Sequence, residues 1–267
     1  MAFYMEEMTV RDMHEAMEQT KTVIIPVGVV EQHGYHLPLS TDIHNAVQVP
    51  RLAGDRLNAV VAPSVNYCFS GGELLGTVNV SPNTVGLFIT EICEEFVRMG
   101  FLNIIVLLGH GGTENKDALQ STLQMLLRRN KELAEKISIS IIDVFDFSVT
   151  ATDITNMEPE HDFHAGMAET ALMMHWIPDL VRDEIAQDDE ETCRMMRQDC
   201  DWFAKHEKII DHPFIVDKVS QRPEIKVGVM GFPERATKEL GEKISNEMVD
   251  GLVNYVNMLQ EKISNMI

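Results

Sequence analysis

The feature that most constrains the fold is a set of short apolar runs rich in β-branched residues, at 22–30, 59–63, 103–109 and 137–144. Runs of this length and composition are typical of strands buried inside a parallel sheet. Pro26 interrupts the first run. Because proline has no N–H to donate, we expect that strand to lie near a sheet edge or at a bulge.

Helical patterns alternate with these runs. They cover residues 9–20, with Thr9 as the cap, then 44–57, 83–99, 114–130 and 165–174, and a last helix from Pro233 to about Ser264 with a break at Gly241 or Gly251. Strands that alternate with helices predict an α/β fold of three layers, α/β/α, with a mostly parallel sheet. We expect one domain, 1–267. In such folds ligands bind beyond the carboxyl ends of the strands, which places a site near residues 31–42 and 110–115.

Charge and cysteine usage narrow the partners. The chain has 22 basic and 42 acidic residues, a net charge of −20, so its surface repels phosphate backbones and nucleic acid is not expected. No apolar run approaches the ~20 residues of a membrane span, so no membrane partner is expected. Scattered cysteines without a CxxC pair, and an N-terminus unlike a signal peptide, predict a cytoplasmic protein. The irregular stretch 178–218 is interpreted as an insertion or an oligomer contact.

The segment from Glu31 to Asp42 contains candidate metal ligands. Glu31 and His33 are two residues apart just past a predicted strand, so an extended backbone directs both side chains to the same side. Each of the two side chains can bind one of two adjacent metals. Asp42, which is expected on a loop, has two carboxylate oxygens that can bridge these metals. Imidazole and carboxylate together favour Zn²⁺, Mn²⁺ or Fe²⁺. An isolated Glu-x-His would more often be a surface pair, so the interpretation depends on further clusters.

Two further clusters follow. His110 directly follows the clearest strand and is flanked by glycines, which let the backbone pass close to a ligand. The alternative is a glycine-rich turn with a hydrogen-bonded histidine. In the third cluster, His164 precedes a predicted helix and Glu169 lies within it, so both can reach one cavity. The alternative there is a capping segment before an ordinary amphipathic helix.

Together the clusters resemble the creatininase (creatinine amidohydrolase) family. The first matching segment is Pro26-Val-Gly-Val-Val-Glu-Gln-His-Gly-Tyr-His-Leu-Pro-Leu-Ser-Thr-Asp42, which is highly specific. The others are Gly109-His-Gly-Gly112, His164-Ala-Gly-Met-Ala-Glu-Thr170, and Gly228-Val-Met-Gly-Phe-Pro-Glu-Arg-Ala-Thr237 with Gly241. They occur in the family's order and span nearly the whole chain.

The resemblance implies a creatininase-like fold, a binuclear metal centre and a homo-oligomer, often a hexamer. By position, Glu31 and His110 would hold one metal and His33 and Glu169 the other, with Asp42 as the bridge. The resemblance implies two divalent metal ions, Zn²⁺ first, with Mn²⁺ or Fe²⁺ as the alternatives.

His164 and Glu114 are candidates for catalytic roles, whereas His36 is not. The resemblance makes His164 a substrate-facing acid/base residue. Glu114 is a candidate to assist it, or else simply begins its helix. His36 is interpreted as structural rather than as a ligand. Only Trp176 and Trp202 are present, and neither matches the tryptophans that creatininases use near the substrate, so we expect a substrate other than creatinine.

These residues predict a metal-dependent hydrolase of a small molecule. A metal-activated water would attack a carbonyl of a small cyclic amide, a formamide or a related ring, and His164 would protonate the leaving group. One alternative is hydrolytic C–C ring opening of an inositol-derived cyclic diketone, as in a 3-dehydro-scyllo-inosose hydrolase, or an isomerase or lyase of polyol ketones. Another is a non-enzymatic binding protein or scaffold, against which the complete ligand set argues.

Overall fold

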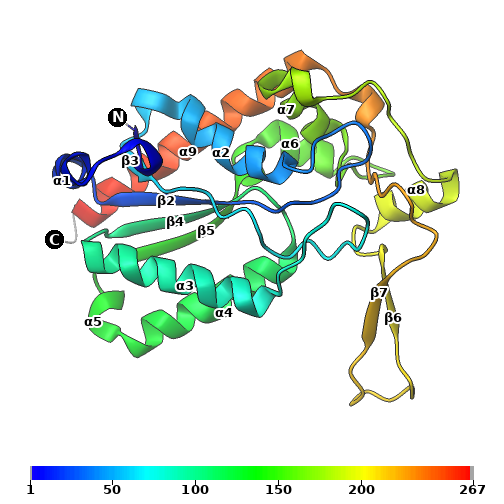
Figure 1. The fold of residues 1–267 in the computed structure, drawn as a ribbon, viewed down its shortest axis with the longest axis horizontal. Helices are drawn as coiled ribbons and strands as arrows, with labels where there is room; N and C mark the ends of the chain where they lie inside the picture. The colour runs from blue at the N-terminus through cyan, green and yellow to red at the C-terminus, as the bar shows by residue number, and fades with distance from the viewer. Residues whose placement is uncertain (1, 265–267) are drawn as a thin grey trace.

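The computed structural model describes residues 2–264, and a five-stranded sheet lies at its centre (Figure 1). The strand order is β1-β3-β2-β4-β5, and every neighbouring pair is parallel. The strands are β1 (Ala2–Tyr4), β2 (Thr22–Val27), β3 (Ala59–Val61), β4 (Asn103–Leu108) and β5 (Ser138–Asp143). The four predicted strands are therefore confirmed within a few residues, and β1 is added at one edge.

Helices cover both faces of this sheet (Figure 1). One face carries α2 (Thr41–Ala53), α6 (Val149–Thr155), α7 (Met167–Trp176) and α9 (Lys238–Ser264). The other carries α1 (Val10–Gln19), α3 (Pro82–Met99) and α4 (Thr113–Arg129), with the short α5 (Lys131–Ala134) following α4. As predicted, Thr9 caps α1, where its side chain accepts a hydrogen bond from Asp12 N.

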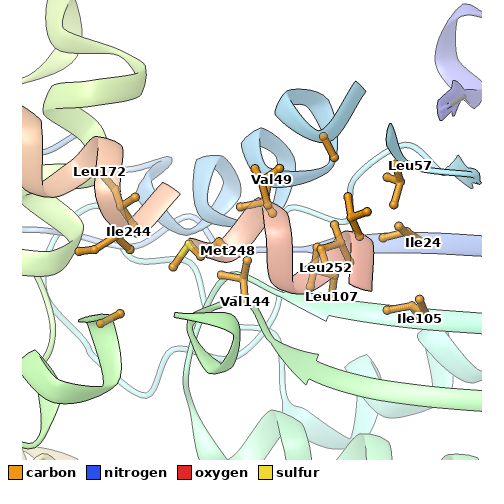
Figure 2. Close-up of a cluster of buried hydrophobic side chains, with 14 of the residues drawn as sticks. Ile24, Val49, Leu57, Ile105, Leu107, Val144, Leu172, Ile244, Met248 and Leu252 are labelled. Carbon is orange, nitrogen blue, oxygen red and sulfur yellow. The ribbon is translucent and has the colours of Figure 1, made fainter. Parts of the chain in front are cut away.

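Alternation along the strands divides the core into two clusters. Ile24, Ile105 and Leu107 face α2, α7 and α9, where they meet residues such as Val49, Leu172 and Met248 (Figure 2). Their sequence neighbours in β2 and β4 point to the opposite face and pack against α3 and α4. Because successive strand residues point to opposite faces, both faces need apolar residues, which explains the uninterrupted apolar runs. The predicted α/β/α fold of three layers is confirmed.

Of the two positions predicted from Pro26, the sheet edge is wrong, because β2 is the central strand. The bulge is confirmed, since Ile24 pairs with Val61 and Val27 with Val65, which leaves one extra residue opposite Ile25 and Pro26. The Pro26 carbonyl accepts a hydrogen bond from Val65 N, so the proline nitrogen faces the β3 side of the strand. There, β3 has already ended at Val61. The missing N–H therefore falls where regular pairing has stopped.

Helix boundaries also differ from the prediction. Helix α2 begins at Thr41 rather than His44 and ends at Ala53. Helix α9 begins at Lys238, after a separate 3₁₀ turn at Pro233–Arg235. It continues through Gly241 and Gly251, where a break was expected. Glycine is present at both positions because the helix makes close packing contacts there. A Cβ atom on Gly241 would meet the Ala171 carbonyl oxygen, and one on Gly251 would meet the Phe147 side chain.

The stretch 178–218 is more ordered than its composition suggests. It contains α8 (Glu190–Gln198) and β6 (Ala204–Glu207), and β6 pairs with β7 (Lys218–Gln221) as an antiparallel hairpin. The hairpin projects away from the sheet (Figure 1). Among the described helices, none combines the length and the apolar character that crossing a membrane requires.

Candidate metal centre

The site residues predicted from the sequence converge at the carboxyl edge of the sheet. Val27 and Leu108 end the neighbouring strands β2 and β4 and are paired with each other. The segments that leave these strands therefore start side by side. Glu31 and His33 follow β2, and His110 follows β4.

Asp42 reaches this place because the first turn of α2 packs directly against the backbone beyond both strands. Two glycines allow the approach. A Cβ atom on Gly109 would lie 2.0 Å from the Asp42 carbonyl oxygen, and one on Gly28 would lie 2.7 Å from Cα of Ile43. The predicted loop at Asp42 is wrong, since the residue lies in the first turn of the helix. The helix fixes the carboxylate more rigidly than a loop would.

Glu31, Asp42 and His110 form a first group of candidate ligands. One ligand atom from each lies within 4.8 Å of the others. Nδ1 of His110 is 3.1 Å from Oε2 of Glu31 and 3.5 Å from Oδ2 of Asp42. Two carboxylates and an imidazole are a donor set that suits Zn²⁺, Mn²⁺ or Fe²⁺.

His33, His164 and Glu169 form a second group within the same limit. Nε2 of His33 is 3.6 Å from Oε2 of Glu169 and 3.4 Å from Oδ1 of Asp42. The two oxygens of Asp42 thus face different groups, Oδ1 toward His33 and Oδ2 toward His110. A carboxylate in this position can bridge two cations.

Buried polar atoms at the centre of both groups fit bound cations. Oε2 of Glu31, Nε2 of His33 and Oδ2 of Asp42 are buried and have no hydrogen-bond partner among the described residues. Buried polar atoms are costly unless they are paired, and native proteins leave few of them unpaired. Because these atoms converge instead of scattering, a pair of cations would satisfy them together.

Neighbouring charges at the site shift the pKa values of its residues in the direction opposite to the effect of burial. Burial lowers the pKa of His33 and His110, but Asp42 beside the first and Glu31 beside the second raise each pKa well above its usual range. Burial raises the pKa of Glu31 and Glu169, but the histidines around them lower both, that of Glu169 to about 2. Glu31 and Glu169 therefore stay ionised at neutral pH and need positive charge beside them.

The segment before α7 directs Glu169 inward. The buried carboxylate of Asp162 accepts hydrogen bonds from the backbone N–H groups of Met167 (2.9 Å) and Phe232 (2.7 Å). Ala165 takes a left-handed conformation with φ of 54°. Its N–H donates to Oε2 of Glu169 at 2.7 Å. The turn thereby orients the carboxylate before the helix begins.

His164 belongs to the second group and also lines the pocket. Its Nε2 lies 2.7 Å from the carbonyl oxygen of Gln32, the shorter of two contacts with that residue, so this nitrogen carries the proton. Its Nδ1 then has a free lone pair, 3.7 Å from Oε1 of Glu31. Burial, and then the nearby His33, lower the pKa of His164, which favours the neutral ring.

Glu114 and His36 lie outside both groups. Glu114 is in the first turn of α4, with an exposed side chain on the pocket wall. His36 is buried, and its Nε2 lies 3.0 Å from Oγ1 of Thr170. Burial, and then His33, lower the pKa of His36 to about 4, so the ring is neutral. This geometry agrees with the structural role expected for His36.

A cavity of about 480 Å³ opens onto both groups. Its walls come from the loops after β3 and β5 and from the region of α8 and the hairpin, including Ser70, Gly72, Leu74, Asp143, Phe145, Asp146, Met196, Phe203, Gln221 and Ile225. The third wall was not predicted, because residues 178–218 were interpreted as an insertion or an oligomer contact, although α8 buries one face through Thr192, Cys193 and Met196. Asp143 ends β5 and so carried the same strand-end signal as His110, which could have identified it.

The sequence and the fold resemble those of known proteins. Residues 6–256 match the family model described as Creatininase: Creatinine amidohydrolase. The chain is 24% identical over 247 residues to a creatinine amidohydrolase of Pseudomonas putida, and the alignment covers 88% of each of the two chains. It is 28% identical over 263 residues to a mycofactocin precursor peptide peptidase of Mycolicibacterium smegmatis, over 94% of this chain and 90% of the relative. A solved structure titled Creatininase Mn aligns with a TM-score of 0.76 at 21% identity, over 97% of this chain and 98% of that one.

Proposed function

The chain belongs to the creatininase family and is a hydrolase, and we propose that it uses two divalent cations to cleave the C–N bond of a small amide. The observation that carries the proposal is the position of Asp42, whose two oxygens face two separate groups of candidate ligands. The Mn form of the similar solved structure supports divalent cations in general. We propose Zn²⁺ first, with Mn²⁺ or Fe²⁺ as the alternatives.

In this proposal five candidate ligands divide between the two groups. Glu31 and His110 would hold one cation and His33 and Glu169 the other, with Asp42 shared between the two groups. Divalent cations in such sites supply Lewis acidity and lower the pKa of water toward neutrality. The protein's contribution is to hold three carboxylates and two imidazoles in place without rearrangement, through α2, α7 and the two strand ends.

His164 is the proposed acid/base residue. Its Nε2–H is held by the Gln32 carbonyl, so only Nδ1 is free to exchange a proton. Nδ1 accepts a proton from the attacking water and returns it to the leaving nitrogen, which keeps the charge balanced through the reaction. Glu114, exposed on the wall, is a proposed helper at the outer end of the pocket.

The pocket also supports a substrate class. The names of both relatives describe cleavage of an amide or a peptide, which supports C–N cleavage. The described residues that line the cavity include no lysine or arginine, whereas Glu114, Asp146 and Asp201 are acidic. A surface of this sign repels carboxylates and phosphates. We therefore propose an uncharged or cationic cyclic amide or formamide.

Three broader proposals accompany this one. Both core clusters lie against the same sheet, which supports a single domain. The four cysteines are free thiols, which supports a cytoplasmic location. We also propose a homo-oligomer.

Turnover in H₂¹⁸O tests the proposal. Metal-free protein reloaded with Zn²⁺ or Mn²⁺ would be screened against uncharged, cationic and anionic cyclic amides and formamides. We expect turnover only with metal, a new amino group that stays on the product when the substrate is cyclic, and labelled oxygen in the new carboxylate. Product without label would point to an isomerase, and labelled product from a cyclic ketone alone would point to C–C hydrolysis. Undiminished turnover by metal-free protein would contradict the two-metal scheme.

A further inference from the structure

The hairpin of β6 and β7 ends in an apolar tip that no described residue covers. We call this surface the tip, and it consists of Ile209, Ile210, Phe214 and Val216. Their exposures are 95%, 64%, 87% and 90%. Figure 1 shows the hairpin extending away from the rest of the molecule. Clustered apolar side chains with this exposure mark an interaction surface.

Four of the six charged side chains of the hairpin form ion pairs within it. Lys205 lies 2.7 Å from Glu207, and Asp217 lies 3.3 Å from His206 and 3.4 Å from Lys208. Residues 204–221 contain three basic and three acidic residues, so this segment has no net charge in a chain of −20. Acidic bodies repel one another. The hairpin is therefore an element that can approach a second acidic molecule without that repulsion.

A second apolar surface lies at the rim of the pocket. We call it the loop patch, and it consists of Leu39, Leu75 and Val78, with exposures of 46%, 100% and 44%. The two loops that contribute to it touch, because a Cβ atom on Gly76 would lie 2.7 Å from Cδ2 of Leu39. Leu75, fully exposed, is the residue of the patch that most needs a partner.

The tip of one molecule cannot reach its own loop patch. The base of the hairpin is fixed beside the patch, where the Gln221 N–H donates to Oε2 of Glu73 at 3.4 Å. From that base, roughly 20 Å of strand separates Gln221 from the tip at about 3.3 Å per residue. The two apolar surfaces can therefore meet only between molecules.

We propose that the tip of one copy of this chain docks on the loop patch of a second copy. Each copy carries both surfaces, so the contact is heterologous and repeats until a ring or a reciprocal pair closes. The loop of the patch and the base of the hairpin also line the cavity, through Gly72 and Leu74 on one side and Phe203 and Gln221 on the other. Assembly would thus hold two walls of the pocket at once.

Sedimentation velocity of the full-length protein tests the contact, with three variants. The double variant Ile209→Ser with Phe214→Ser removes the tip, and Leu75→Ser removes the centre of the patch. Val10→Ser is the matched control, since Val10 is 77% exposed but lies on α1, at the far end of the molecule from the hairpin (Figure 1). We expect an oligomer for the wild type and the control, and at least a tenfold rise in the dissociation constant for each of the other two. Circular dichroism would show that all four are folded.

A cross-linking experiment fixes the pairing. Phe214→Cys and Leu75→Cys would be placed in two differently tagged chains, each also carrying Cys200→Ser because Cys200 is exposed. We expect a disulfide between the two chains when they are mixed and none with either alone. A monomeric wild type, an oligomer that survives both sets of serine substitutions, or tip-to-tip cross-linking of Phe214→Cys alone would each overturn the proposal.

Discussion

Replacing Gly109 with alanine should damage the metal centre without altering any candidate ligand. Gly109 lies between the end of β4 and His110. A Cβ atom there would lie 2.0 Å from the carbonyl oxygen of Asp42 and 2.7 Å from the nitrogen of Ala46. Both are backbone atoms of α2, so no change of rotamer relieves the overlap. Either the helix or the strand end has to move.

The size of that movement follows from the contact distances. Ordinary contacts begin at 3.4 Å, so atoms now 2.0 Å apart must separate by about 1.4 Å, whereas metal–ligand distances tolerate only about 0.2 Å. We expect metal affinity to fall at least about tenfold, as for other changes behind a ligand. Overpacking should cost about 1–3 kcal/mol, which lowers Tm by roughly 2–12 °C in a chain of this size.

Two measurements check this prediction: metal content after dialysis and thermal unfolding of the same samples. Gly72→Ala is the control, because its Cβ would come no closer than 3.4 Å to any side chain or backbone atom outside its immediate neighbours. That variant should match the wild type in both measurements. A Gly109→Ala protein with unchanged Tm and full metal content would refute the claim that this close approach positions Asp42.

Three further predictions concern other parts of the structure. His164→Gln should lower kcat by about 10²–10⁴-fold while the protein keeps its metal, and loss of the metal instead would show that His164 acts as a ligand. Glu247 accepts hydrogen bonds from the Ser148 and Thr150 side chains, and although burial opposes them these bonds lower its pKa below 4.5. A carboxyl group whose pKa is lower in the folded state than in the unfolded chain stabilises the fold at pH values above the unfolded pKa. In urea unfolding at pH 7, Glu247→Gln should therefore lower the free energy of unfolding by about 1.5 kcal/mol. The difference from the wild type should shrink as the pH falls below 4.5, and a difference that stays constant with pH would contradict this role. Chelation should lower Tm, because cations that bind the folded state at a thousand times Kd add about 4 kcal/mol, and re-addition of Zn²⁺ should restore it; a Tm indifferent to chelator would argue against bound metal.

The layers of the fold were predictable because the strands are buried on both faces. β2 and β4 show this burial as continuous apolar runs, and the runs are bounded by clear helical patterns. β1 has only three residues and is half-buried, so it left no comparable signal. The hairpin was not predictable either. Its strands are four residues each and largely exposed, so neither apolar alternation nor a two-residue turn marks them.

The site was predictable to the extent that its residues follow strand ends. Glu31, His33 and His110 do, and the structure brings them together where the strand-end rule places them. The helical placement of Asp42 was missed, although Ser40 at the N-cap and the acidic Asp42 in the first turn are both signals of a helix start. The glycine contacts that position it join residues 67 positions apart in the chain, at Gly109 and Asp42. A single sequence contains no signal for such a contact.

Metal content of the purified protein, set beside that of Asp42→Ala, shows whether two cations share this carboxylate. Asp42 is the residue that both groups share, so its loss should affect both sites together. Plasma mass spectrometry after dialysis should find about two divalent ions per chain in the wild type and neither in Asp42→Ala, with circular dichroism showing that the variant is folded. A wild type that holds a single ion, or a variant that keeps both, would contradict a centre bridged by Asp42.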